Sequence, residues 1–111
     1  WRPTHGFPAR YGWRAAVLRG HTQVAQGLDV DVPVLVLRSA KSLISPVWDD
    51  AMAESDIVIE VDVIAERALR IARVVTVAKI PGALHDVLLS RKEVRAQAYE
   101  HIARWAAGYI D

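Results

Sequence analysis

Cysteine is absent from this sequence of 111 residues, so neither a disulfide nor a thiolate metal site can form. A chain without cysteine suits a reducing compartment, and we expect a cytoplasmic location. Long apolar runs are also absent, since no stretch approaches the roughly 18 residues that a membrane-spanning helix needs. We therefore expect no membrane span.

An excess of charge of one sign is lacking too. The 14 basic and 13 acidic residues leave a formal net charge of +1, and the basic ones are scattered along the chain. This pattern gives no electrostatic footprint for a nucleic acid. The 4 histidines form no pair with the spacing of a zinc site, so we expect no metal and no other cofactor. Hydrophobic residues make up 52% of the chain, which is typical of a globular domain.

Apolar periodicity predicts helices and strands in alternation. A stripe of Trp13, Val17, Val24 and Leu28 indicates a first helix, and unbroken apolar residues from Val34 indicate a parallel strand covered on both faces. The expected elements are a helix over 8–27, a strand over 34–37, a helix over 61–72, a strand over 74–80 and a helix over 93–110.

This order predicts an α/β fold with a parallel sheet, built from two strands and three helices. Two strands alone leave sheet edges unpaired and too little surface to bury the apolar helix faces. We therefore interpret residues 1–111 as a single partial domain. The remaining strands would come from a longer parent protein or from a second copy of the chain.

Two polar residues with catalytic potential follow the two predicted strands. Asp56 ends the long connection over 39–56, and His85 follows the Pro-Gly turn after the second strand. Functional side chains gather beyond the carboxyl ends of parallel strands, and neighbouring strands lie about 4.8 Å apart. We expect these two side chains to form the Asp–His half of a hydrolytic triad.

Four segments carry a resemblance to a known family. "PVLVLRS" resembles the strand before the acid turn of an α/β-hydrolase, and "SDIVIEVDVIAERA" is similar to its acid loop and helix. "VVTVAKIPGALHDVLLS" resembles its last strand and histidine loop, and "VRAQAYEHIARWAAGYI" its terminal helix. The chain thus looks like the C-terminal part of a lysophospholipase or monoacylglycerol-lipase-like serine hydrolase. The resemblance implies a small ester substrate, with Asp56 as triad acid and His85 as general base.

The sequence departs from this family in two places. The acid connection is longer than the family's short turn, which leaves Asp49, Asp50 and Asp62 as alternative acids, with Asp62 ranked last because it should face solvent. No serine lies in the G-x-S-x-G pattern of a nucleophile elbow. The nucleophile would therefore lie in a missing N-terminal half, and this chain alone should not hydrolyse esters.

Other interpretations stay open beside this one. Trp48 in the long connection would line a substrate pocket or pin the connection to the core, and His21 would be a core histidine within the first helix. The pair His85-Asp86 is also found in metal-dependent phosphohydrolases, but the predicted strands argue against that fold. An alternative function is a truncated, non-catalytic domain that associates through an exposed strand edge.

Overall fold

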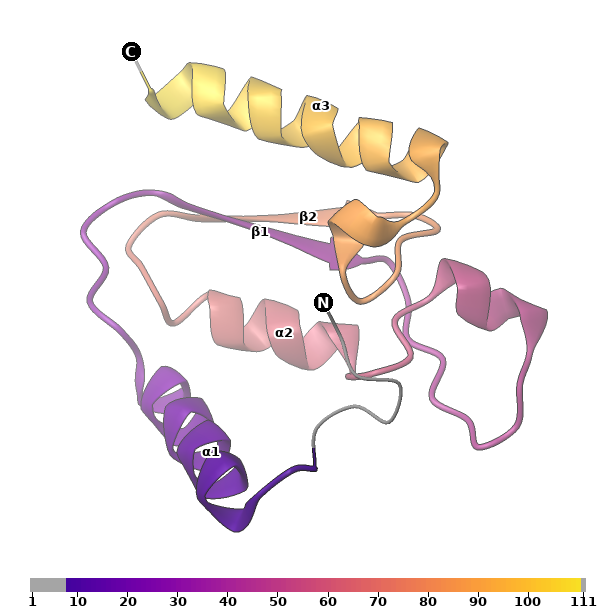
Figure 1. The fold of residues 1–111 in the computed structure, drawn as a ribbon. Coiled ribbons are helices and arrows are strands. Elements are labelled where there is room, and N and C mark those ends of the chain that lie inside the picture. Colours follow the sequence, from indigo (N-terminus) through magenta and orange to yellow (C-terminus); the bar gives the residue numbers. More distant parts are fainter. Residues whose placement is uncertain (1–7, 111) are drawn as a thin grey trace.

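The computed structural model describes residues 8–110, which form three α-helices, two β-strands and two short 3-10 helices (Figure 1). In chain order these are α1 (Tyr11–Gln26), β1 (Val34–Ser39), η1 (Asp50–Glu54), α2 (Val61–Ala68), β2 (Val75–Ile80), η2 (Val87–Leu89) and α3 (Lys92–Tyr109).

The two strands pair in parallel, with Val34 opposite Val75 and Ser39 opposite Ile80. Helix α3 lies on one face of the pair and α2 on the other (Figure 1). The predicted α/β arrangement of two parallel strands and three helices is therefore confirmed for the described residues.

Helix α2 is shorter than the sequence pattern predicts, because it ends at Ala68 rather than at residue 72. The backbone beyond Ala68 instead pairs with the segment that leads into β1. Leu28 N–H donates to the Arg70 carbonyl at 2.8 Å, and Val30 N–H donates to the Ile71 carbonyl at 3.2 Å. These bonds draw residues 69–72 out of the helix.

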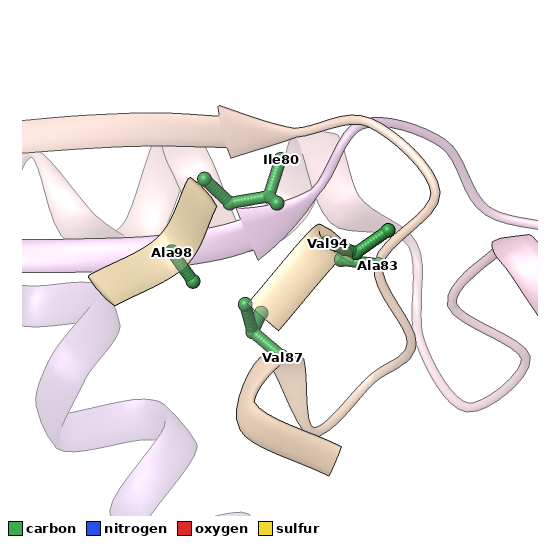
Figure 2. Close-up of a cluster of buried hydrophobic side chains, with 5 residues drawn as sticks. All are labelled: Ile80, Ala83, Val87, Val94 and Ala98. Carbon is green, nitrogen blue, oxygen red and sulfur yellow. The ribbon is translucent and has the colours of Figure 1, made fainter. Parts of the chain in front are cut away.

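The core between β2 and α3 is small and is built from small or β-branched side chains. Ala83 and Ala98 are fully buried, and the absence of longer side chains there lets α3 lie close to the strands. Figure 2 shows the cluster that results, formed by Ile80, Ala83, Val87, Val94 and Ala98.

The apolar stripe of α1 is where the sequence prediction is wrong. No residue of α1 is buried, Trp13 and Leu28 are exposed, and His21 is exposed rather than part of the core. The carboxyl end of the helix is held by polar contacts instead, since the Arg70 guanidinium donates to the Ala25 carbonyl at 3.0 Å. The apolar face of α1 is therefore not packed into a core formed by the described residues.

Candidate active site

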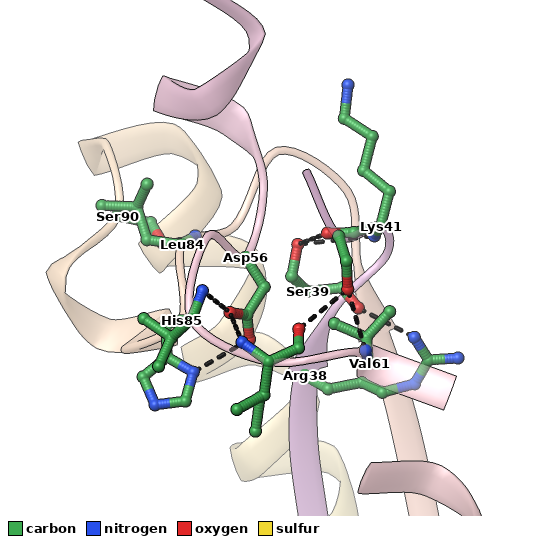
Figure 3. Close-up of polar contacts among 11 residues, drawn as sticks. Arg38, Ser39, Lys41, Asp56, Val61, Leu84, His85 and Ser90 are labelled. Atoms are coloured by element: carbon green, nitrogen blue, oxygen red, sulfur yellow. Dashed lines mark hydrogen bonds and ion pairs between the residues drawn. The ribbon is translucent and has the colours of Figure 1, made fainter. Parts of the chain in front are cut away.

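Asp56 and His85 are in direct contact at the carboxyl ends of the two strands. The Nδ1 atom of His85 lies 2.9 Å from Oδ2 of Asp56 (Figure 3). The Asp56 side chain is only 1% exposed, whereas the His85 side chain is 45% exposed. A buried carboxylate thus orients an imidazole that remains open to solvent.

The backbone of Asp56 is held against the chain just beyond β1. Asp56 N–H donates to the Lys41 carbonyl at 3.0 Å, and Leu43 N–H donates to the Asp56 carbonyl at 2.8 Å. These two bonds form a parallel bridge centred on Ser42 and Asp56. The long connection therefore leaves β1 and returns to it, which brings the acid back to the strand end.

The carboxylate of Asp56 also closes its own turn. Its Oδ1 atom accepts hydrogen bonds from the backbone N–H groups of Val58 at 2.8 Å and Ile59 at 3.0 Å. Burial by itself raises the pKa of Asp56. The hydrogen bond from His85, the two backbone donors and the charge attraction of His85 outweigh burial, so the pKa of Asp56 is lowered.

The loop that carries His85 is fixed on both sides of the histidine. Gly82 adopts φ +74, a left-handed conformation that suits glycine and turns the chain after β2. Leu84 N–H donates to the buried Ser90 hydroxyl at 2.9 Å. Asp86 accepts from Leu88 N–H at 3.2 Å and so caps η2. These contacts set where the imidazole lies.

The ionisation of Asp56 decides the tautomer of His85. An ionised carboxylate has no proton to donate, so Nδ1 must carry the proton in the contact between them. In the neutral imidazole the other ring nitrogen, Nε2, is then unprotonated. The pair consequently presents an unprotonated ring nitrogen, Nε2, on the side of the imidazole away from Asp56.

The alternative acids lie in other contacts. Asp49 accepts from Ala51 N–H at 2.8 Å and caps η1, and Asp50 accepts from the Trp48 indole at 3.2 Å. Asp62 is 91% exposed, as expected, and pairs at 3.1 Å with Arg38, whose side chain is 2% exposed. Of the described carboxylates, Asp56 is the one in contact with the imidazole.

Trp48 does not pack into the core, and that expectation is wrong. Its side chain is 67% exposed. A separate apolar hollow of about 510 Å³ lies between α1, α2 and β1, and neither Asp56, His85 nor Trp48 lines it. Its lining consists of His21, Val24, Val36, Ile59, Glu60, Val63, Ile64, Arg67, Ala68 and Ile71.

Each of the five serines has a hydrogen bond at its hydroxyl, and in the described part of the chain none of these bonds reaches His85. No helix within residues 8–110 is long and apolar enough to cross a membrane. Across the same residues, no three histidine or acidic side chains gather as potential metal ligands.

Comparison with protein-family models, with curated proteins and with solved structures found no match to this chain. The fold and the contact between Asp56 and His85 are therefore the basis for functional inference.

Two residues that shape the site gave no signal in the sequence. The Ser42 hydroxyl contacts residues 17 and 19 positions further along the chain, and the Ser90 hydroxyl supports the residue before His85. Serine is common in connections, so its type alone does not indicate either contact.

Proposed function

We propose that this chain is the C-terminal part of a serine hydrolase of the α/β-hydrolase type, which resembles lysophospholipases and acts on carboxylic esters. The observation that carries the proposal is the 2.9 Å contact between His85 Nδ1 and the buried carboxylate of Asp56. It lies at the carboxyl ends of adjacent parallel strands, where such folds gather functional groups. The absence of cysteine supports a cytoplasmic location.

In this proposal His85 acts first as a base and then as an acid. A serine hydroxyl from a segment beyond these residues gives its proton to Nε2 while its oxygen attacks the ester carbonyl. His85 passes that proton to the leaving alcohol, and an acyl-enzyme remains. A water molecule then gives a proton to Nε2 and attacks the acyl carbon. The bond from that carbon to the serine oxygen breaks, and His85 returns the proton to this oxygen, which releases the carboxylic acid and restores the serine. Asp56 stays ionised and holds Nδ1–H throughout.

The strand composition favours the outer edge of β1 as the place where further strands would add. Residues 34–37 of β1 are apolar on both faces, as in a central parallel strand. In β2, Lys79 is exposed and Thr76 accepts a hydrogen bond from the Trp105 indole. A lysine is typical of a strand that ends a sheet. The nucleophile would therefore arrive from the β1 side.

The proposal is tested in a polypeptide that carries a nucleophile segment ahead of residue 1. Hydrolysis of a short p-nitrophenyl ester and labelling by a fluorophosphonate probe are measured for His85→Ala, Asp56→Asn and Asp86→Asn. We expect the first variant to abolish turnover and the second to lower it about 10⁴-fold, the scale seen when a triad acid is neutralised. Asp86→Asn is the matched control, because Asp86 caps η2 instead. Full turnover in His85→Ala would remove the catalytic assignment.

A second candidate function is association without catalysis, and the unpaired edge of β1 favours it. Val34 N–H donates to the Val74 carbonyl across the pair. Because N–H groups point alternately to the two sides of a strand, Leu35 N–H points to the outer edge of β1. By the same alternation, Val77 N–H points to the outer edge of β2. Leu35→Pro should therefore disrupt association and Val77→Pro should not, as read by light scattering after size exclusion. A monomeric parent chain would eliminate this candidate.

A further inference from the structure

The hydroxyl of Ser42 joins two ends of the turn that surrounds the Asp56 carboxylate. Its Oγ atom donates to the Ile59 carbonyl at 2.9 Å and accepts from Val61 N–H at 2.9 Å. Both partners lie on the far side of the turn from Asp56, at the point where α2 begins. A single side chain thus bridges the end of β1 and the start of α2.

The start of α2 depends on this contact. The first N–H groups of a helix have no partner within it and are usually satisfied by the residue that precedes the helix. Glu60 occupies that position and makes no capping bond with its side chain. The hydroxyl that receives Val61 N–H belongs instead to Ser42, 19 residues earlier.

The same residue lies at the backbone bridge that fixes Asp56. The bonds from Asp56 to Lys41 and from Leu43 to Asp56 lie on either side of Ser42. Ser42 therefore holds the turn at both ends: its backbone neighbours fix residue 56, and its side chain fixes residues 59 and 61. The labelled residues Asp56 and Val61 in Figure 3 mark the two ends.

The turn held in this way supplies two of the three donors to the carboxylate. Ile59 uses its N–H for Asp56 and its carbonyl for Ser42, so its orientation is set from both sides. Val58 N–H, one residue earlier, is carried along with it. If the turn relaxed, the carboxylate would lose donors and be free to rotate away from His85.

We propose that Ser42 is a positioning residue, whose hydroxyl keeps the turn over 56–61 closed so that the Asp56 carboxylate stays aligned with His85. Its importance for ester hydrolysis rests on the proposed function, but its effect on the pair does not. Among the hydrogen bonds of the described residues, none joins Ser42 to Asp56 Oδ2 or to the imidazole, so Ser42 acts through the turn.

The test uses the chain itself and two NMR signals. The first is the ¹³C shift of the Asp56 carboxyl group against pH, which in the unmodified chain should report a pKa below the ordinary aspartate range. The second is the pair of ¹⁵N shifts of His85, which distinguish the Nδ1–H from the Nε2–H tautomer. Neither signal responds to a change in helix stability alone.

Ser42→Ala should move the Asp56 titration upward, because the carboxylate loses backbone donors, and should turn a uniform Nδ1–H tautomer into a mixture. Ser42→Thr, which keeps the hydroxyl, should restore both signals. Ser45→Ala is the matched control, since the exposed Ser45 hydroxyl contacts only Val47 two residues on. If Ser42→Ala fails to fold, Ser42→Cys keeps the volume and weakens the same bonds.

Unchanged Asp56 and His85 signals in a folded Ser42→Ala or Ser42→Cys variant would overturn the proposal and leave Ser42 as a helix cap only. The same shifts in Ser45→Ala would also overturn it, because they would not be specific to the bridge. Altered signals in a protein that never hydrolyses esters would uphold the positioning role and refute the hydrolase proposal, so the two failures are distinguishable.

Discussion

Neutralising Asp56 should alter how the stability of the chain depends on pH. The carboxylate is buried and accepts three hydrogen bonds, two from backbone N–H groups and one from His85. Bonds to an ionised acceptor contribute roughly 1.5–3 kcal/mol each, and neutral ones about 0.5–1.5 kcal/mol. Asparagine has the same shape and keeps neutral versions of these bonds.

From these contacts we expect Asp56→Asn to lower the free energy of unfolding by about 1–2 kcal/mol near pH 6, because the weaker bonds are offset in part by the easier burial of a neutral amide. The pKa of folded Asp56 is lowered. Its ionisation therefore stabilises the fold above the ordinary aspartate value of about 3.9, and this contribution is lost as the pH falls through the lower folded-state pKa.

The measurement is urea unfolding followed by circular dichroism at pH 5, 4, 3 and 2. The difference between the unmodified chain and Asp56→Asn should shrink toward zero over this series, because the protonated acid and the amide become equivalent. Asp49→Asn, which changes an exposed carboxylate in the same connection, is the matched control. If the free energy of unfolding of Asp56→Asn instead falls with pH as steeply as that of the unmodified chain, protonation of Asp56 is not the cause of the loss of stability in acid.

Four further substitutions test packing and backbone conformation by the same unfolding measurement. Gly82→Ala should lower the free energy of unfolding by about 1–2 kcal/mol, because the φ of Gly82 is +74 and a Cβ would lie 3.3 Å from a Val94 methyl. A Cβ at Gly20 in α1 would meet nothing within 4 Å, so Gly20→Ala should raise the free energy of unfolding by about 0.5–1 kcal/mol. Ala98→Leu should cost about 1–3 kcal/mol by overpacking a fully buried position, and a smaller cost would mean that α3 is free to shift outward. Trp105→Phe should lower the free energy of unfolding by about 0.5–1.5 kcal/mol, because it removes the 3.1 Å hydrogen bond to the Thr76 hydroxyl. If Trp105→Phe lowers it equally in a chain that already carries Thr76→Val, this hydrogen bond is not the cause.

The elements that the sequence predicted well are those whose pattern reflects contacts present within the chain. The apolar run from Val34 is covered on both faces by α2 and α3, so it behaves as a parallel strand and its partner follows at β2. The contact between Asp56 and His85 could be predicted from the same rule, because both follow the carboxyl ends of these strands.

The failures have a different physical origin. The stripe containing Trp13 predicted a packed helix, but a stripe shows only that a face is apolar and not that a surface lies opposite it. Helix α2 ends early because Arg70 and Ile71 pair with a distant segment, and such pairing leaves no local pattern. Trp48 was expected to pin the connection to the core because of its size, yet its indole contacts a neighbouring aspartate at the surface.

The contacts that build the Asp56–His85 pair all arise within the two strands and the connections that follow them. Residues 41–61 hold the carboxylate, and residues 80–90 hold the imidazole. None of these contacts requires α1 or the outer edge of β1, where the chain shows exposed apolar surface. The contact between Asp56 and His85 is therefore formed completely by two parallel strands and the connections that follow them. In the proposed hydrolase, a polypeptide that adds to the β1 edge would need to contribute only a nucleophile and the donors that stabilise the reacting carbonyl, because the contact with Asp56 already orients His85.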